Sequence, residues 1–320
     1  MVLLPDLEIH TLPQPLSALR LPSTQAAVRA YNPSLAWHLE KLVMAFRISS
    51  MTRCHQRFID FERYYSGELP PIINALGVAF LDPATMAVRE ARQLNVTMPR
   101  DCPWTIGYED PRIFSFSGSL YLLVCHRNVK WVFVLSIIEL GRDLEPRRIL
   151  AIETDFDIGM HQKNWNPFVC DNKVLFVSSI APHRIVAVNL DSGRATLVHD
   201  NATGVFRELE TENDLRGGAG YVRCADRYVG VCRSALKQGS ALNTNEYMCV
   251  AYAFGAAPPF AVTGRSEPFI LGQFDGRRTP IQMATGLAQL NDELLIAFGE
   301  NDCDLKIARV PQERILAAIR

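Results

Sequence analysis

The stretch YEDPRIFSFSGSLYLLVCHR, residues 108–127, places a short polar start before an apolar strand, a Ser117-Gly118 turn and a second apolar strand. Four more stretches share this layout: YNPSLAWHLEKLVMAFRIS (31–49), KNWNPFVCDNKVLFVSSI (163–180), RGGAGYVRCADRYVGVCRS (216–234) and MATGLAQLNDELLIAFGEND (283–302). Successive copies lie about fifty to eighty residues apart, which suits one sheet per copy in a radial array. The repeat predicts an all-β fold, a five-bladed β-propeller.

The polar starts of the copies are predicted to meet. If each copy begins the inner strand of its blade, all five starts converge on one end of the central axis. We expect the functional site there, with one residue from the equivalent position of each copy: Asn32, Asp110, Lys163, Arg216 and Gly286.

Length and composition fit one large domain. The chain has 320 residues with 48% apolar content, enough for a substantial core. We expect a single propeller over residues 31–320. Residues 1–30 are rich in Pro and Leu without periodicity, and are expected to form an arm packed on the propeller.

Charge and hydropathy exclude several classes of partner. The formal net charge is −1, so no global basic field would hold nucleic acid or an anionic membrane. The longest nearly unbroken apolar run, residues 131–138, is far shorter than the roughly 20 residues of a spanning helix. The N-terminus lacks the basic segment of a signal peptide. These features predict a soluble, cytoplasmic protein, and a homo-oligomer is compatible with them.

The eight cysteines show no C-x-x-C and no paired spacing of a zinc ribbon. Several occupy strand positions where a small buried hydrophobe fits. We interpret them as reduced core residues rather than as a disulfide framework or a metal site.

Strand signals dominate the remaining sequence. The outer strands of the blades are predicted at residues 72–80, 132–138, 184–189, 247–254 and 260–262. Helical periodicity is limited to Thr24–Ala30 and Gln312–Ile319. Neither a dinucleotide-binding nor a P-loop motif is present, because GGAG at 217–220 lacks the required spacing and the following helix.

YEDPRIF is the most specific local motif. Side chains alternate along a strand, so Glu109 and Asp110 are predicted to point to opposite faces, one functional and one structural. The alternative is a turn in which Asp110 accepts backbone N–H bonds and Arg112 is its ion-pair partner.

KNWNPF is the second motif. Lys163, two Asn and Trp165 before a Pro indicate a polar pocket with one aromatic wall, which suits a sugar or a phosphate. Lys163, His183 and Arg216 are predicted to bind one oxyanion together. A solvated Lys163 and a core His183 are the alternative.

RGGAG and GENDCD complete the set. Paired glycines at an inner strand allow close approach to a ligand or form a bulge. Asp302 brings a polar group to the end of the last hairpin, where it would bind sugar hydroxyls or solvent.

Together these motifs resemble those of the five-bladed propeller enzymes of the β-mannoside phosphorylase family, whose relatives include β-1,2-mannosidases and β-1,2-mannosyltransferases of yeasts and trypanosomatids. The resemblance covers about Tyr31 to Val310. It rests on six motifs in the same order and rough spacing: YNPSL with Arg47, EDPRI, KNWNPF with PHR, LRGG, PPFAVTGRSEPF, and ATGL with FGENDCD.

The resemblance implies roles for individual residues. Asp110 matches the general acid that protonates the glycosidic oxygen. Residues that bind the mannosyl unit are matched by Asn32, Arg47 and Asp302, and substrate-binding residues at the same motifs are Glu109, Arg112, Asn164 and Trp165. Residues near the attacking phosphate are Lys163, His183, Arg127 and Arg216.

The implied reaction is inverting. The resemblance implies that phosphate attacks the anomeric carbon of a terminal β-1,2-linked mannosyl residue and releases α-mannose 1-phosphate. The reverse reaction would extend a mannoside chain from mannose 1-phosphate or GDP-mannose. An inverting hydrolase needs a second carboxylate to activate water, whereas phosphate needs cations beside the acid. The alternatives are an inverting β-mannosidase and a non-catalytic glycan-binding propeller. No cofactor and no metal are implied.

Overall fold

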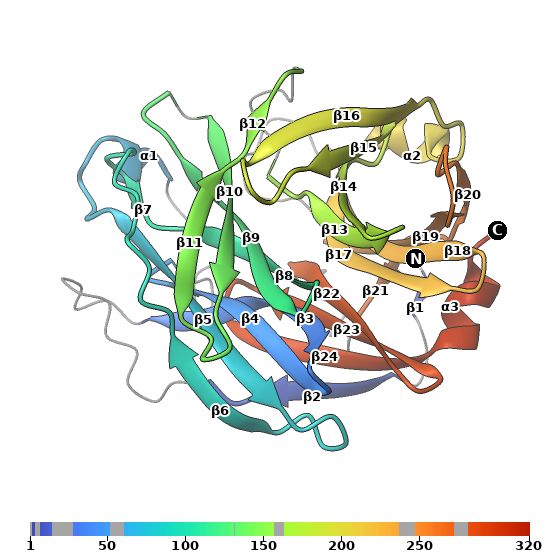
Figure 1. The fold of residues 1–320 in the computed structure, drawn as a ribbon, viewed down its shortest axis with the longest axis horizontal. Helices are drawn as coiled ribbons and strands as arrows, with labels where there is room; N and C mark the ends of the chain where they lie inside the picture. The colour runs from blue at the N-terminus through green and yellow to red at the C-terminus, as the bar shows by residue number, and fades with distance from the viewer. Residues whose placement is uncertain are drawn as a thin grey trace.

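The computed structural model describes residues 2–3, 7–14, 28–51, 61–130, 132–156, 163–236, 247–271 and 281–320. Its strands form five sheets around a central axis, a five-bladed β-propeller (Figure 1). The inner strands contact one another around the axis. The fold predicted from the five repeats is therefore confirmed.

Each sheet begins at one of the predicted repeats. The first contains β3 (Arg29–His38), β4 (Lys41–Ser49), β5 (Ile72–Leu81), β6 (Val88–Gln93) and β7 (Thr105–Ile106). The second contains β8 (Glu109–Phe116), β9 (Ser119–Arg127), β10 (Phe133–Leu140) and β11 (Pro146–Ala151). The third contains β13 (Asn166–Cys170), β14 (Lys173–Ser179), β15 (His183–Val188), β16 (Arg194–Asn201) and β12 (Glu153–Thr154).

The last two sheets also use strands from the N-terminal part of the chain. The fourth contains β17 (Asn213–Cys224), β18 (Arg227–Leu236), β19 (Tyr247–Gly255), β20 (Val262–Arg265), β21 (Phe269–Ile270) and β1 (Val2–Leu3). The fifth contains β22 (Gln282–Leu290), β23 (Glu293–Glu300), β24 (Asp304–Pro311) and β2 (Glu8–Leu12).

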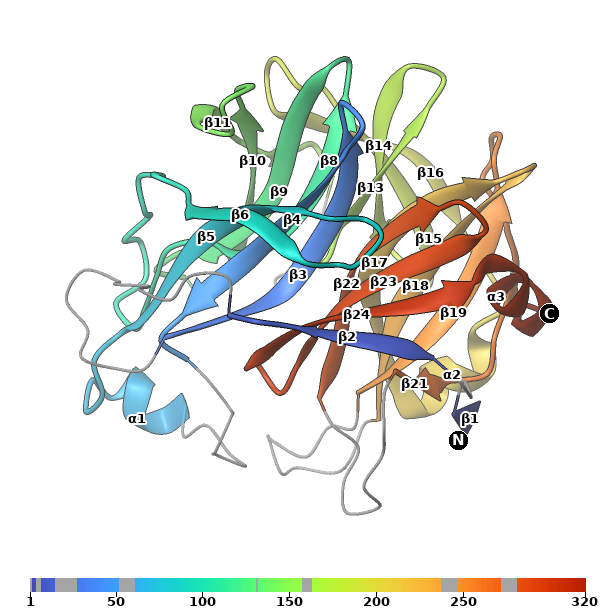
Figure 2. The same cartoon turned by 90° about the horizontal axis from the view of Figure 1, so that it is seen from below.

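Strand β2 closes the ring. It pairs antiparallel with β24, from Glu8 opposite Arg309 to Leu12 opposite Leu305, and the two strands lie side by side in both views (Figures 1 and 2). This part of the predicted N-terminal arm is thus the outermost strand of the fifth sheet. Gln14 follows it, accepting from the N–H of Ala30 at 2.8 Å.

Short helices lie around the sheets: α1 (Phe61–Tyr65), α2 (Arg207–Glu212) and α3 (Gln312–Ala318). α3 confirms the predicted C-terminal helix. The helix predicted at Thr24–Ala30 is wrong at its end, because Arg29 and Ala30 begin β3, and residues 24–27 lie outside the described residues. In Figure 2, α1 and α2 lie at one end of the axis, and the turn between β8 and β9 lies at the other.

Tight turns join the inner strands to their neighbours. Ser117 and Gly118 have φ of 48° and 77°, and Asp171 and Asn172 have φ of 48° and 55°. Positive φ at both central positions matches the twist of two-residue hairpins and favours Asn, Asp and Gly. The turn predicted at Ser117-Gly118 is therefore the one that the chain forms.

The apolar core lies between neighbouring sheets. Five buried clusters each join two adjacent blades, as these pairs of residues show: Ile48 with Leu305, Val78 with Leu122, Leu135 with Val186, Ile185 with Tyr252, and Val231 with Ile296. Both faces of an inner blade strand are thereby covered, which explains the nearly continuous apolar runs in the sequence.

Six cysteines are free and buried, at 102, 125, 170, 224, 232 and 249, as expected for small core residues. Cys303 is disulfide-bonded, which corrects the prediction that all the cysteines are reduced. Cys54 lies outside the described residues. No helix within the described ranges is long and apolar enough to cross a membrane.

Candidate active site

The inner strand β8 carries a bulge directly after Glu109. Glu109 pairs with Cys125 and Arg112 with Leu123, so that Asp110 and Pro111 together oppose one residue of β9. Asp110 has φ of +47°, in the left-handed region. The extra residue breaks the alternation of side chains. The prediction that Glu109 and Asp110 point to opposite faces is therefore wrong, since both carboxylates contact Lys163.

The first blade repeats this bulge. In β3, Tyr31 pairs with Arg47 and Ser34 with Ala45, and Asn32 has φ of 52°. Asn32 and Asp110 each precede a proline, which cannot donate to the ladder. The side chains of both bulges turn toward each other, and Asn32 Nδ2 donates to Asp110 Oδ1 at 2.8 Å.

Two carboxylates and two cations form the centre of the site. Lys163 Nζ lies 3.1 Å from Asp110 Oδ2 and 3.3 Å from Glu109 Oε2. Arg47 Nη1 lies 3.3 Å from Asp110 Oδ1 and 3.6 Å from Glu109 Oε2. The Asp110 side chain is 1% exposed and that of Lys163 is 19% exposed, so the cluster is buried on the Asp110 side and more open at Lys163.

Electrostatic interactions keep Asp110 and Lys163 charged. Burial by itself raises the pKa of Asp110, but the cations of Lys163, Arg47 and Arg112, with the hydrogen bond from Asn32, hold it well below its ordinary range. Burial lowers the pKa of Lys163, and the neighbouring carboxylates outweigh it and raise the pKa. Asp110 is therefore an ionised carboxylate at neutral pH when no ligand is bound.

A buried amide orients Arg47. Arg47 Nε donates to Asn74 Oδ1 at 2.9 Å, and Ser49 Oγ donates to the same oxygen at 2.7 Å. Asn74 Nδ2 donates to Thr105 Oγ1 at 3.2 Å, and the Arg47 guanidinium also lies 5.2 Å from the Tyr31 ring centroid. Sequence reasoning missed Asn74. The available signal was an amide within the apolar strand IINALG.

Two glycines let neighbouring blades approach the cluster. A Cβ on Gly299 would lie 2.2 Å from Asn32 Oδ1, and a Cβ on Gly217 would lie 1.9 Å from the main-chain oxygen of Asn164. Any larger residue would displace these groups. Gly217 thereby brings its neighbour Arg216, which is half-buried, next to the KNWNP segment.

The fifth predicted position, Gly286, packs against the first blade. A Cβ there would lie 2.6 Å from the backbone nitrogen of Leu35. Of the five residues predicted to meet, Asn32, Asp110 and Lys163 are linked by side-chain contacts. Gly286 packs on the backbone of Ser34 and Leu35, and Arg216 is next to Gly217, which packs on the main-chain oxygen of Asn164.

Arg127 lies beside Lys163 across an aromatic ring. The Arg127 guanidinium is 4.2 Å and Lys163 Nζ is 5.2 Å from the centroid of Phe133. Arg127 also stacks over Trp104, at 5.3 Å. The electron-rich ring attracts both cations. Phe133 was not predicted to take part.

Asp302 lies at the rim of the cluster. It has φ of 47° and is half-buried. Burial lowers the pKa of Arg47, whereas Tyr31 and the charges of Glu109, Asp110 and Asp302 raise it above its ordinary value. Asp302 therefore acts electrostatically on the arginine that contacts Asp110.

Trp165 lies in the core. Its side chain is 0% exposed and stacks on Phe156 at 6.5 Å, with Phe176 at 6.3 Å. This position does not support the prediction of an aromatic wall for a sugar.

His183 is also in the core. It is 0% exposed, and its ring lies 4.9 Å from that of Phe254 and 6.1 Å from that of Tyr252. Burial lowers its pKa to about 4, so the imidazole is neutral at pH 7. No contact of the described residues joins it to Lys163. The prediction that His183 supplies positive charge to an oxyanion is corrected accordingly.

Arg112 ties the second blade to the third. Its Nε donates to Asn166 Oδ1 at 3.1 Å and its Nη2 to Asn164 Oδ1 at 3.4 Å. Its Nη1 donates to the main-chain oxygen of Asp110 at 3.3 Å. Arg112 therefore faces the cluster from behind the Asp110 backbone, as a support, and makes no ion pair with the Asp110 carboxylate.

The cluster is suited to binding anions and transferring protons. Among the described residues, no three His, Cys, Asp or Glu side chains gather in a way that could hold a metal ion. An anionic ligand can take the place of a carboxylate beside Lys163 or Arg47, because the ligand supplies the negative charge that the cation attracts.

Sequence comparisons find no relative. No family model matches the chain, and no curated protein matches its sequence.

Solved structures share the fold. The β-1,2-mannobiose phosphorylase from Listeria innocua, in complex with β-1,2-mannobiose, superposes with a TM-score of 0.65 at 12% identity, over 97% of this chain and 99% of that one. A structure reported for the GH130 family of mannoside phosphorylases, which contains glycoside hydrolases that target β-1,2-mannosidic linkages in Candida mannan, gives 0.60 at 15% identity over 90% and 86%. MPT-1, a GDP-Man-dependent mannosyltransferase from Leishmania mexicana, gives 0.54 at 9% over 88% and 85%.

Proposed function

We propose that this chain is a mannoside-processing enzyme that exchanges a β-linked mannosyl unit with phosphate, with inversion, at the cluster of Glu109, Asp110, Arg47 and Lys163. The observation that carries the proposal is the ammonium of Lys163 between two carboxylates at the ends of the inner strands. The fold shared with a β-1,2-mannobiose phosphorylase supports the choice of substrate.

The proposed role of each residue follows from its position in the cluster. Asp110 is the proton donor to the glycosidic oxygen, since Asn32 and Arg47 hold one of its oxygens and leave the other toward the more open Lys163. Asn32, Arg47 and Asp302 border the mannosyl unit. The attacking phosphate meets Lys163 and Arg127, the two cations beside Phe133, with Arg216 close to the same segment.

In the proposed reaction one phosphate oxygen attacks the anomeric carbon while the bond from that carbon to the leaving oxygen breaks. The proton of Asp110 passes to the leaving oxygen, and the products are α-mannose 1-phosphate and the shortened mannoside. Asp110 must first be protonated. Phosphate supplies the condition for this, because its charge on Lys163 weakens the attraction that keeps Asp110 ionised.

The separation of the carboxylates disfavours the inverting hydrolase. Glu109 Oε2 and Asp110 Oδ2 both reach one nitrogen, at 3.3 and 3.1 Å. The two oxygens are therefore closer together than the ~6.5–9.5 Å that leaves room for a water in inverting glycosidases. Two other acids, Glu300 and Glu208, contact Lys306 and Arg265 and not the cluster. The side chain of Glu210 lies outside the described residues.

One experiment tests the proposed reaction and also identifies the donor of the reverse reaction. The purified protein is incubated with β-1,2-mannobiose, with and without phosphate, and with mannose plus either α-mannose 1-phosphate or GDP-mannose. We expect phosphate-dependent release of α-mannose 1-phosphate. Synthesis from GDP-mannose alone would identify a nucleotide-sugar transferase. Free mannose released at a rate independent of phosphate would establish the hydrolase, and no turnover in any mixture would overturn the proposal.

A further inference from the structure

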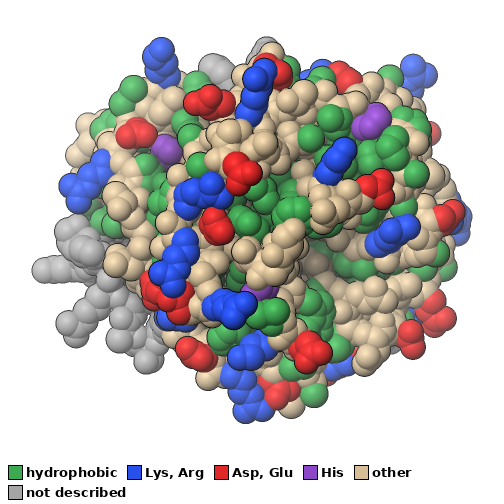
Figure 3. All heavy atoms as spheres, in the orientation of Figure 1, with side chains coloured by type: hydrophobic (Ala, Val, Ile, Leu, Met, Phe, Trp, Pro, Cys, Tyr) green, Lys and Arg blue, Asp and Glu red, His purple; other side chains and the backbone are tan. Residues whose placement is uncertain are grey.

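A cavity of about 350 Å³ lies on the propeller axis, beyond the carboxylate cluster. All five inner strands contribute residues to its wall, among them Ser34, Arg112, Phe168, Tyr221 and Leu287. The face of the molecule seen in Figure 1 is hollowed near its middle (Figure 3). Glu109, Asp110 and Lys163 do not line this cavity, so it is a separate space.

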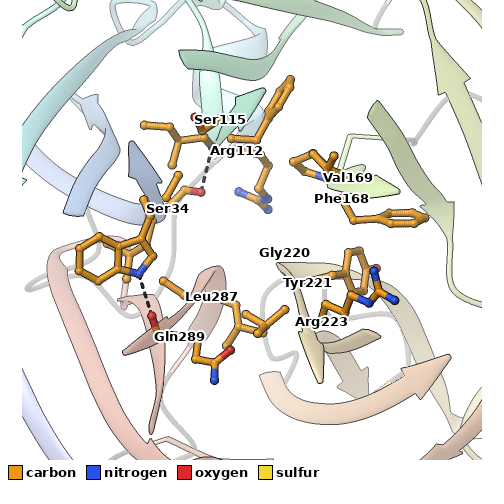
Figure 4. A pocket seen from close by; sticks show the side chains of 18 of the residues that line it. Ser34, Arg112, Ser115, Phe168, Val169, Gly220, Tyr221, Arg223, Leu287 and Gln289 are labelled. Carbon is orange, nitrogen blue, oxygen red and sulfur yellow. Dashed lines mark hydrogen bonds between the residues drawn. The ribbon is translucent and has the colours of Figure 1, made fainter. Parts of the chain in front are cut away.

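Arg112 and Arg223 are the charged residues of the cavity lining. Figure 4 shows the guanidinium of Arg112 projecting between the inner strands near the middle of the cavity, whereas Arg223 lies at its edge. Arg112 is 2% exposed. Its hydrogen bonds go to amide and main-chain oxygens, at 3.1 to 3.5 Å, and all of these acceptors are uncharged.

This charge makes no direct ion pair. Within the described part of the chain no Asp or Glu oxygen lies within 4.0 Å of Arg112. The Asp110 carboxylate, which contacts Arg47 and Lys163 directly, acts on Arg112 only at longer range. Burial lowers the pKa of Arg112, and the charge of Asp110 offsets only part of this effect. A buried cation of this kind is stabilised by an anion, and the cavity is the accessible place for one.

We propose that the axial cavity is a second binding site, for a small organic carboxylate with an apolar body. The carboxylate group would meet Arg112, and the body would lie against Ile113, Phe168, Val222 and Leu287. Inorganic phosphate is the less suitable oxyanion, because its remaining oxygens would lose water against apolar side chains. This binding does not depend on the mannoside reaction.

The site is coupled to the carboxylate cluster through one side chain. Arg112 Nη1 donates to the main-chain oxygen of Asp110 while its outer edge faces the cavity. A carboxylate in the cavity is therefore expected to change mannoside turnover. This consequence rests on the proposed function, whereas the binding itself is measured without any turnover.

Gly220 provides a variant that fills the cavity. It lines the wall, and a Cβ there would meet only the Pro167 oxygen, at an ordinary 3.8 Å. Gly255, at the end of β19, is the matched control, since a Cβ there would meet only the Ala257 oxygen at 3.7 Å and the residue does not line the cavity. Gly220→Leu and Gly255→Leu are thus the same chemical change at two places.

The test is calorimetric titration of the full chain with hexanoate and, separately, with inorganic phosphate. We expect saturable one-to-one binding of hexanoate that weakens at least tenfold in Gly220→Leu, stays within twofold in Gly255→Leu, and persists in Lys163→Met. Arg112→Gln, checked for folding by circular dichroism, is expected to lose it.

Three outcomes would overturn the proposal. The first is no saturable heat from hexanoate with the folded wild type. The second is hexanoate binding to Gly220→Leu as tight as to the wild type. Hexanoate binding lost in Lys163→Met and kept in Gly220→Leu would place the anion at the carboxylate cluster. The proposed active site predicts that phosphate binds and that only Lys163→Met loses this binding. A different result for phosphate would count against the proposed active site and not against the cavity.

Discussion

Asn32 donates a hydrogen bond to Asp110 across the boundary between the first and second blades, with an Nδ2 to Oδ1 distance of 2.8 Å. Each residue occupies a bulge in the inner strand of its blade, with positive φ and a proline after it. The bond forms only because both strands are bulged at the same level of the axis. The position of the carboxylate is therefore set by two blades together.

Replacing Asp110 is expected to stop the reaction. Asp110→Asn keeps the shape and the bond from Asn32 but cannot donate a carboxylic acid proton, so we expect kcat to fall at least about 10³-fold. Glu109→Gln is the matched control, with a smaller loss. Phosphate-dependent release of mannose 1-phosphate is measured, with circular dichroism as the folding check. A kcat in Asp110→Asn above a tenth of the wild-type value would remove Asp110 from the proposed role.

Phosphate binding is expected to take up a proton. The pKa of Asp110 lies well below its ordinary range while Lys163 faces it, and a phosphate on Lys163 raises that pKa. Titration at pH 8, where phosphate is already a dianion, is performed in buffers of different ionisation enthalpy. The buffer-dependent part of the heat reports uptake in the wild type, and Asp110→Asn should abolish it. Equal heats in all buffers would contradict the exchange of partners.

Asn74 is expected to act as a positioning residue. Asn74→Ala removes the acceptor of Arg47 Nε, so Arg47 swings away from Asp110 and kcat/KM falls about 10- to 100-fold, the equivalent of about 1–3 kcal/mol. The alkaline limb of the pH profile, where the acid Asp110 loses its proton, should also move to higher pH, because Asp110 loses part of the cationic environment that lowers its pKa. Thr105→Val removes only the next bond in the chain and should have a smaller effect. An unchanged pH profile in Asn74→Ala would leave it a purely structural role.

His183 is expected to make stability depend on pH. Its pKa is lowered by burial to about 4, below the ordinary value of about 6.5. The unfolded chain binds this proton more readily, so the contribution is present above pH 6.5 and is lost as the pH falls toward 4. At pH 5 this costs about 2 kcal/mol of unfolding free energy relative to pH 7.

Urea unfolding at the two pH values measures this loss. The variant His183→Gln has no group to titrate, and its stability should change by about 2 kcal/mol less between pH 7 and pH 5. The same pH dependence in both proteins would show that the imidazole is not the cause.

Gly299 is expected to be sensitive to a single methyl group. A Cβ there would lie 2.2 Å from Asn32 Oδ1 and 2.8 Å from the Asn32 nitrogen, so Gly299→Ala must move the residue that binds Asp110. We expect a loss of about 1–3 kcal/mol in stability and reduced turnover. Gly220→Ala, whose Cβ has an ordinary contact, should stay within about 0.5 kcal/mol of the wild type. Equal stability of the two variants would contradict the close approach.

The sequence predicts the architecture well because its signals are local. A hairpin such as residues 109–127 carries both its apolar strands and its turn residues in one stretch, and five such stretches leave few ways to close a sheet. Strand β2 escaped prediction as part of the fifth blade because its partner β24 lies at the other end of the chain.

The site was predicted less completely than the fold. Regular alternation placed Glu109 and Asp110 on opposite faces, and only the bulge with positive φ brings both to Lys163. His183 was predicted as a cation from its residue type, yet contacts with Phe254 and Tyr252, far apart from it in the sequence, make it neutral. Burial and bulges arise from tertiary packing, which spacing along one strand does not report.

The pairing of β2 with β24 has a consequence for biosynthesis. The five residues Glu8–Leu12 leave the ribosome long before the strand they join, Asp304–Pro311, is synthesised. The nascent chain therefore carries an unpaired strand while all five blades are being made, and the fifth sheet is completed by a pairing of very high sequence separation, which is a slow step. Molecules that bind exposed strand edges would act during that interval, before β2 and β24 pair and close the propeller.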